Sequence, residues 1–332
     1  MRVGRDNGKS SGTLCVHKRF ELRTPIATMC FIEFISRDMK DKNSPLADIG
    51  YYLQEIDGCV ITAQAIEYAL GKIPVRDRWC VEFGAGDDLH GSTTNRLIEN
   101  HQYSAVLIEG SQKKFEVLQG FYAGRPNIIT KNLYVGLSAQ DGLDAILAET
   151  PIPPDFDFLS VDIDGNDYHA WNAIVKYHPK IMMVEFNPTI PPEVHFVQPA
   201  DPAINWGSSL VALVELGKKK DYELVGVVGV NAFFTGRKYY PLFGIEDNSV
   251  SALWTKRDCV TYIFCGYDGR VFLRGCQKLP WHYHIPIREP DVQVLPGFLQ
   301  KYSFTRTDKR LFETLKNPFA FARQIFRRLV KK

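Results

Sequence analysis

The sequence lacks any surplus of charge, any long apolar run and any paired-cysteine motif. Its 40 basic and 38 acidic side chains leave no strongly basic surface, so we expect no nucleic-acid partner. Seven cysteines occur without a Cys-x-x-Cys spacing, which favours free thiols in a reducing, cytoplasmic setting. A zinc site can be drawn from three thiols and two imidazoles whose spacings match no compact ligand pair: Cys259, Cys265, Cys276, His282 and His284.

The apolar pattern predicts neither a secretory signal nor a membrane-spanning helix. Residues 1–11 are polar, and the later apolar run 28–35 is interrupted by Glu33 and too short to cross a bilayer. With 45% hydrophobic and 23% charged residues, the chain has the composition of a globular protein. We therefore expect a folded cytoplasmic protein.

A strand, a glycine turn and a helix are predicted in the first third of the chain. The apolar run into Glu82 is typical of a buried strand, Gly84 and Gly86 follow directly, and residues 92–100 have a helical pattern. A dinucleotide fingerprint would need a third glycine where Leu89 stands, and the Gly-Lys-Ser/Thr ending of a phosphate loop is missing. The remaining pattern suits S-adenosylmethionine, because bare backbone admits its amino-acid end and acids favour its cationic groups.

A second acid stands at the end of the next predicted strand. The apolar run 104–108 leads into Glu109, whose carboxylate is a good acceptor for two ribose hydroxyls. Each motif alone is compatible with an ordinary turn after a strand. The two together, about one βα unit apart, favour a nucleoside cofactor.

Strands and helices alternate over residues 79–235, which predicts a doubly wound, mostly parallel sheet of the Rossmann-like kind with seven strands. Ligands of such sheets lie beyond the carboxyl ends of the strands. A long proline-bearing loop, 189–206, could form a lid there. Five carboxylates fall at these ends, although scattered surface acids would also account for them: Glu82, Glu109, Asp162, Asp164 and Glu185.

The most distinctive motif is the Asp-Ile-Asp-Gly-Asn-Asp-Tyr segment that starts at Asp162. Strand periodicity places Asp162 and Asp164 on the same side, and Gly165 allows a sharp turn. Together with Glu185 and Asn187 at the next strand end, the two aspartates could hold Mg²⁺. Such an ion would lower the pKa of a bound hydroxyl and align it.

These motifs resemble those of the class I S-adenosylmethionine-dependent methyltransferases, and within that class the FkbM-like enzymes, which are often associated with surface polysaccharides or secondary metabolism. The resemblance covers about residues 78–235 and implies a Rossmann-like methyltransferase fold with additions at both ends. It is carried by residues 81–87, 107–110, 158–168 and 184–188. By this resemblance the residues that bind the cofactor are Glu82, Gly84, Gly86, Asp87, Glu109 and Asp162.

The expected reaction is transfer of a methyl group to a hydroxyl, most simply of a sugar in a surface glycan or a secondary metabolite. Such an in-line displacement requires a positioned acceptor and exclusion of water. The acceptor proton needs a base, and the candidates are Asp164 and His169, with His90 behind them, while Asp162 can orient the cofactor instead. For His169, an ordinary place on a helix surface is the competing interpretation.

Two other classes of function fit the same residues. The chain could be a methyltransferase-like module that binds a ligand or a membrane without turnover. It could also be a hydrolase in which Asp162, Asp164 and Glu185 hold a metal ion, and this enzyme would act without S-adenosylmethionine.

Four segments are expected along the chain. They are an N-terminal extension with a packing helix (1–70), the cofactor-binding domain (71–240), a β-rich addition (241–315) and a basic amphipathic helix (316–332). From residue 301 onward ten basic residues outnumber two acids, a net charge of +8. Such a helix suits the anionic inner face of a membrane, and docking on its own domain is the alternative.

Overall fold

The computed structural model describes residues 58–74, 76–86 and 92–316. All of them belong to one compact unit within Lys42–Lys332. The predicted amphipathic helix, most of the predicted N-terminal extension, and the site candidates Asp87 and His90 lie outside the described residues. The limits of the four predicted segments stay predictions.

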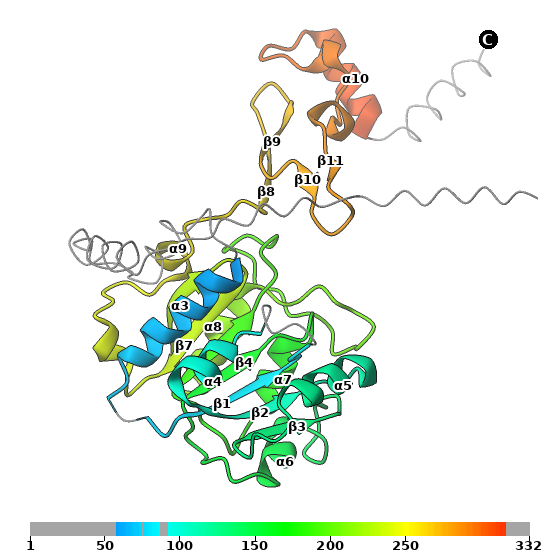
Figure 1. Ribbon diagram of the computed structural model, residues 1–332. Helices are drawn as coiled ribbons and strands as arrows, with labels where there is room; N and C mark the ends of the chain where they lie inside the picture. Colours follow the sequence, from blue (N-terminus) through cyan, green and yellow to red (C-terminus); the bar gives the residue numbers. More distant parts are fainter. Residues whose placement is uncertain (1–57, 75, 87–91, 317–332) are drawn as a thin grey trace, which may run out of the picture. The chain divides into compact units, whose positions relative to one another are not determined.

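A seven-stranded sheet in the order β3-β2-β1-β4-β5-β7-β6 forms the centre of the fold (Figure 1). The first five strands pair in parallel, and β7 runs antiparallel to both β5 and β6. The predicted doubly wound, mostly parallel sheet is thereby confirmed. The strands are β1 (Trp79–Phe83), β2 (Ser104–Ile108), β3 (Ile128–Lys131), β4 (Phe158–Val161), β5 (Ile181–Glu185), β6 (Tyr222–Val228) and β7 (Asn231–Gly236).

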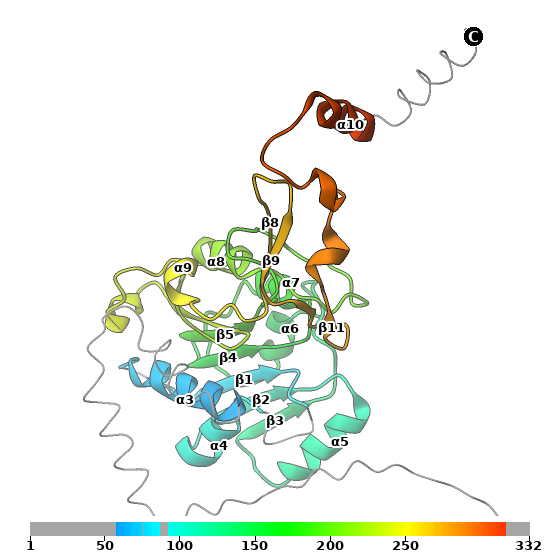
Figure 2. The same ribbon diagram turned by 90° about the horizontal axis from the view of Figure 1, so that it is seen from above.

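The order of strands reverses between β1 and β4, as Figure 2 shows. From β1 the chain moves outward through β2 to β3, then returns and continues through β4 to β5. Right-handed crossovers then place α4 and α5 on one face of the sheet and α7 and α8 on the other. The helices are α3 (Gly58–Gly71), α4 (Asn95–His101), α5 (Gln112–Phe121), α6 (Leu143–Ala148), α7 (Asp167–Ala173) and α8 (Leu210–Lys219).

The core follows from apolar runs that are buried on both faces of the sheet. Every residue of β4 is buried, and so are four of the five residues of β5. Parallel strands covered by helices on both sides need such continuous apolar stretches. The close packing of α7 and α8 depends on Gly217, because a β-carbon there would lie 3.0 Å from the ring of the buried Trp171.

A buried ion pair and its hydrogen bonds join the amino ends of four strands. Asp157, which is fully buried, accepts hydrogen bonds from the Lys180 ammonium at 2.6 Å and from the Tyr103 hydroxyl at 3.1 Å. The Oδ2 atom, which accepts from Tyr103, also accepts from the backbone N–H of Arg78 at 3.0 Å. These residues stand just before β4, β5, β2 and β1, so one carboxylate aligns the starts of four neighbouring strands.

The chain after β7 forms short elements, among them a β-hairpin. β8 and β9 pair antiparallel, and Gly269 occupies the connecting turn with a φ of +84°. Within the described part of the chain no helix has both the length and the apolar character needed to cross a membrane. The elements are η1 (Tyr240–Phe243), α9 (Val250–Leu253), β8 (Thr261–Cys265), β9 (Val271–Gly275), β10 (Lys278–Leu279), β11 (Ile285–Pro286), η2 (Glu289–Val292), η3 (Gly297–Leu299) and α10 (Arg306–Lys316).

Candidate functional site

The carboxyl ends of four parallel strands lie level with one another. Phe83 of β1 pairs with Ile108 of β2 and with Val161 of β4, and Val161 pairs with Val184 of β5. The next residue of each strand therefore falls on one line across the switch point, which is where ligands of doubly wound sheets bind. These residues are Gly84, Glu109, Asp162 and Glu185.

Gly84 brings bare backbone into this line. Its φ is +78°, and a β-carbon on it would lie 2.2 Å from the carbonyl oxygen of Asp162. No side chain fits there without movement of the main chain, because a contact of that length is far inside van der Waals distance. The first glycine of the motif thus lets the turn after β1 pass directly over the end of β4.

Glu109 connects the turn after β1 to the end of β2. Its Oε2 accepts a hydrogen bond from Gly86 N at 2.8 Å, and its Oε1 accepts one from Ser111 N at 2.7 Å. The residue is only 7% exposed, so the carboxylate has a fixed position. An ionised carboxylate has about four acceptor positions, and two backbone N–H groups leave room for further donors such as hydroxyls.

Glu82 points to the start of α4. Its carboxylate accepts hydrogen bonds from the hydroxyls of Ser92 at 2.7 Å, Thr93 at 2.8 Å and Thr94 at 2.5 Å, and from Thr93 N at 2.8 Å. The charge thus holds the chain that follows the glycine turn. Sequence reasoning missed these three hydroxyls, although a Ser-Thr-Thr run before a helix is a recognisable capping signal. A direct role of Glu82 at the cofactor stays a prediction.

Three carboxylates converge at the ends of β4 and β5. Ligand oxygens of Asp162, Asp164 and Glu185 all lie within 4.8 Å of one another. Burial, and then the charge of Asp162, raises the pKa of Glu185 to about 9, and burial also raises the pKa of Asp162. Like charges this close ionise together only when a proton or a cation compensates them. An all-oxygen set of this kind is what Mg²⁺ prefers, so the cluster fits the predicted ion.

Asn187 is engaged elsewhere. Its side-chain oxygen accepts hydrogen bonds from Thr189 N at 2.9 Å and from the Thr189 hydroxyl at 2.6 Å. The amide therefore shapes the turn after β5, and Glu185 is the residue of this strand end that joins the carboxylate cluster.

The turn after β4 is held in a strained shape. Asp164 has a φ of +55°, which is uncommon for a residue with a side chain, and Gly165 follows with a φ of +141°. The carboxylate of Asp167 accepts hydrogen bonds from Ile163 N and Gly165 N, both at 2.9 Å, and fixes this geometry. Burial raises the pKa of Asp167 to about 6. The turn, and not strand alternation, brings Asp164 back towards Asp162.

His169 connects this turn to the long loop after β5. Its Nε2 lies 2.6 Å from the carbonyl oxygen of Gln198, so the ring N–H at Nε2 donates to that oxygen. In the neutral ring only Nδ1 is then left to accept a proton. Its assignment as a base stays a prediction, and the observed contact gives it a positioning role.

A buried glutamine holds the shape of the predicted lid, the loop 189–206. Gln198 is 1% exposed, its Oε1 accepts from the backbone N–H groups of Trp206 and Gly207 at 2.8 Å each, and its Nε2 donates to Ile204 O at 2.8 Å. Asn166 Nδ2 also donates to the loop, at 3.1 Å from Asp201 O. The loop therefore has a defined conformation beside Asp164.

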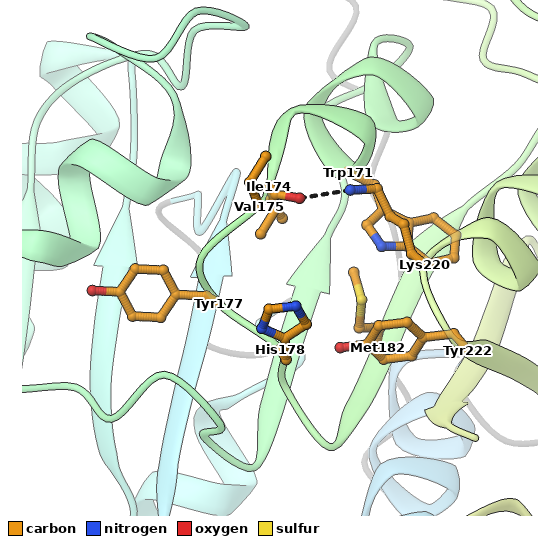
Figure 3. A pocket seen from close by; sticks show the side chains of 8 residues that line it. All are labelled: Trp171, Ile174, Val175, Tyr177, His178, Met182, Lys220 and Tyr222. Atoms are coloured by element: carbon orange, nitrogen blue, oxygen red, sulfur yellow. Dashed lines mark hydrogen bonds between the residues drawn. The ribbon is translucent and has the colours of Figure 1, made fainter. Parts of the chain in front are cut away.

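A cavity of about 160 Å³ lies at the amino ends of β5 and β6, the ends away from the carboxylate cluster (Figure 3). Figure 3 shows the Lys220 ammonium directed at Ile174 O, to which it donates at 2.6 Å. This contact satisfies a carbonyl at the end of α7 and gives the lysine a structural role. The cavity is lined by Trp171, Ile174, Val175, Tyr177, His178, Met182, Lys220 and Tyr222.

Comparison with known proteins found no matching family model and no matching curated protein. Several solved structures are similar at low identity. The N-terminal domain of EvdMO1 with SAH bound is 12% identical, covers 54% of this chain and 79% of its own, and has a TM-score of 0.34. The CurJ carbon methyltransferase is 10% identical over 55% of each chain, with a TM-score of 0.36. The mycolic acid cyclopropane synthase CmaA1 is 16% identical over 50% of this chain and 65% of its own, with a TM-score of 0.33.

Proposed function

We propose that this chain is an S-adenosylmethionine-dependent O-methyltransferase of the FkbM-like kind. The observation that supports it best is the alignment of Gly84, Glu109 and Asp162 at the switch point of the sheet. A glycine turn that tolerates no side chain lies between two acids there. This is the arrangement that a nucleoside with a cationic amino-acid end requires.

Each part of this site has a separate task in binding the cofactor. The turn Gly84–Gly86 would lie against the amino-acid end, and at Gly84 a side chain would collide with the Asp162 carbonyl oxygen. Glu109 would accept the ribose hydroxyls through the acceptor positions that Gly86 N and Ser111 N leave free. When bound, S-adenosylmethionine supplies an electrophilic methyl group on a sulfonium.

The carboxylate cluster would activate the acceptor hydroxyl. Asp164 is exposed, whereas Glu185, with its pKa raised to about 9, carries a proton at neutral pH if no cation is present. We propose Asp164 as the group that takes the proton, with Asp162 and Glu185 beside it. If Asp162, Asp164 and Glu185 hold Mg²⁺, the ion would lower the pKa of the acceptor hydroxyl.

The acceptor we propose is a sugar hydroxyl of a surface glycan or a secondary metabolite. Calorimetric titration with S-adenosylmethionine tests the cofactor, and mass spectrometry of carbohydrate acceptors tests the reaction through a gain of one methyl group. Binding without any methyl gain would indicate a module without turnover. Hydrolysis of an ester substrate by the Mg²⁺-loaded protein, with no response to the cofactor, would favour the hydrolase and refute this proposal.

We further propose peripheral contact with an anionic membrane, at the cytoplasmic face, through the C-terminal part of the chain. In α10 the apolar residues Leu311, Phe312 and Leu315 share one side, and Leu315 is 52% exposed. The basic residues Arg306 and Arg310 lie on the opposite side, and Lys309 and Lys316 flank the apolar side next to Phe312. Apolar and basic faces together are typical of helices that lie in the headgroup region.

A further inference from the structure

The hairpin tip between β10 and β11 carries four aromatic residues in succession, Trp281, His282, Tyr283 and His284. All four are exposed, Tyr283 at 99% and Trp281 at 48%. Aromatic rings outside the core bury little area and add little to folding. Their concentration at one tip therefore needs an explanation other than stability.

The backbone of this tip is strained as well. Tyr283 and His284 have φ values of +54° and +58°, so two successive residues with side chains occupy the left-handed region. Two reverse turns hold them, with His282 N donating to Leu279 O and Ile285 N donating to His282 O, both at 3.1 Å. Strain of this kind persists where the surroundings fix it, and it gathers at ligand sites.

The tip contacts the loop that lies on the candidate site. The ring of Trp206 stacks on that of His282, with centroids 5.6 Å apart and planes at 19°, and it meets Trp281 edge-on at 6.4 Å. Trp206 itself remains 42% exposed. We call Trp206, Trp281 and His282 the aromatic wall.

Backbone contacts place the chain just before Trp206 against the turn that carries Asp164. A β-carbon on Gly165 would lie 2.7 Å from Ile204 O and 3.0 Å from the Cα of Asn205. Gly165 directly follows Asp164, and Asn205 directly precedes Trp206. The N–H of Trp206 is fixed by the buried Gln198 at 2.8 Å. Trp206, the first residue of the wall, therefore directly follows the two residues that lie against the turn carrying Asp164.

We propose that the aromatic wall binds the pyranose ring of the acceptor, and this inference rests on the proposed methyl transfer to a sugar. The faces of aromatic rings carry a negative electrostatic potential, which attracts the polarised C–H bonds on the apolar face of a sugar. The imidazole of His282 and the indole N–H groups of the tryptophans can bond hydroxyls at its edge. Without a bound cation, a phosphate-bearing or carboxylate ligand would be repelled by the negative charge of the nearby cluster around Asp162 and Asp164, whereas a neutral sugar would not be.

The test uses methyl glycosides of glucose, galactose, mannose and rhamnose as probes of the full chain, saturated with S-adenosylhomocysteine and without it. Saturation-transfer NMR reports contact with the ring C–H protons, and titration gives the dissociation constant. We expect at least one glycoside to bind, and Trp206→Ala and Trp281→Ala each to weaken its binding at least tenfold. Trp281→Phe should restore most of the affinity, because a flat apolar face remains. Tyr267→Ala, which removes a 98% exposed ring at the β8–β9 turn, is the matched control and should change nothing.

The outcomes separate this inference from the proposed function. Absence of binding by every glycoside, or equal binding in wild type and both alanine variants, would overturn the aromatic wall as a sugar site. If S-adenosylhomocysteine fails to bind in calorimetry while the tryptophans still mediate glycoside binding, the methyltransferase proposal fails and the sugar site stands. Circular dichroism of each variant verifies that the fold is retained, which the exposure of these rings leads us to expect.

Discussion

The α-carbon of Gly84 lies so close to Asp162 that a β-carbon on it would approach the Asp162 carbonyl oxygen to 2.2 Å. The contact joins the turn after β1 to the end of β4, the two strands on either side of the switch point. Because the opposing atom belongs to the backbone, it cannot rotate away as a flexible side chain could. The distance between the glycine turn and Asp162 is therefore set by main-chain atoms.

We predict that Gly84→Ala destabilises the protein by about 3 kcal/mol or more, since it adds a backbone clash to the cost of a positive φ. Gly229→Ala is the matched control, because Gly229 also has a positive φ of +60° but nothing within 4 Å of a β-carbon. It should lose only about 1–2 kcal/mol. Urea denaturation measures both. Equal losses in the two variants would show that the contact with Asp162 is unimportant.

Glu109→Gln tests the proposed cofactor site directly. A glutamine keeps one acceptor oxygen but replaces the other by an NH₂ group, which would face Gly86 N or Ser111 N, both donors. We expect the affinity for S-adenosylhomocysteine in calorimetry to fall at least about tenfold, or about 1.4 kcal/mol. Glu116→Gln, on the exposed side of α5, should leave the affinity unchanged. Unchanged affinity in Glu109→Gln would remove this residue from the site.

The sequence was sufficient to predict the sheet and the convergence of its carboxyl-end residues. Continuous apolar runs followed by acids mark parallel strands, and parallel strands in register bring their last residues into one line. Gly84, Glu109, Asp162 and Glu185 illustrate this, because the register of β1, β2, β4 and β5 follows from pattern and topology. The prediction of these strand ends used only the local pattern of apolar runs and acids, and the tertiary structure agrees with that pattern.

Side-chain partners were less accessible to sequence reasoning. The carboxylate of Glu82 accepts hydrogen bonds from three hydroxyls just before α4. The carboxylate of Asp167 holds the turn after β4 by accepting from two backbone N–H groups. Asp164 approaches Asp162 through a left-handed turn, although alternation along a strand had suggested the same proximity. The role of Gln198 was the hardest to predict, because none of its sequence neighbours indicates that this glutamine is buried and holds the shape of a loop.

The carboxylate cluster predicts an unusual pH dependence of stability. The pKa of Glu185 is raised to about 9 in the folded protein from an ordinary value of 4.5. Between these values the folded state retains a proton that the unfolded chain has lost, so this contribution is complete below about pH 4.5 and disappears as the pH rises through 9. Without divalent ions, the free energy of unfolding should therefore decline over this range, as measured by urea denaturation.

Mg²⁺ should oppose that decline, because a bound cation replaces the proton between the carboxylates. We expect the stabilisation by millimolar Mg²⁺ to increase with pH and to vanish in Glu185→Gln, whose own pH dependence should be flatter. Glu193→Gln, in the loop after β5, serves as a charge-matched control. An identical Mg²⁺ effect in wild type and Glu185→Gln would exclude the cluster as the ion site.

The buried ion pair at the opposite ends of the strands should matter for folding alone. Lys180→Met leaves Asp157 buried without its cation and should destabilise the protein by about 3–5 kcal/mol. Arg288→Met removes an exposed partner of Asp291 and should leave the stability nearly unchanged. Affinity for S-adenosylhomocysteine should be unchanged in folded Lys180→Met, since this residue lies at the far end of β5 from Glu185. A large loss of affinity would instead connect the two ends of the sheet.

The proposed contact with a membrane assigns a role to the apolar side of α10 and to the basic residues around it. Leu315→Glu should reduce sedimentation of the full chain with phosphatidylglycerol vesicles, because it places a charge where burial in the headgroup region is expected. Thr314→Glu changes the net charge equally but lies nearer the basic side, so its effect should be smaller. Phosphatidylcholine vesicles, which lack net charge, should bind the wild-type protein weakly. Equal binding of all three proteins to both kinds of vesicle would show that α10 does not mediate the contact.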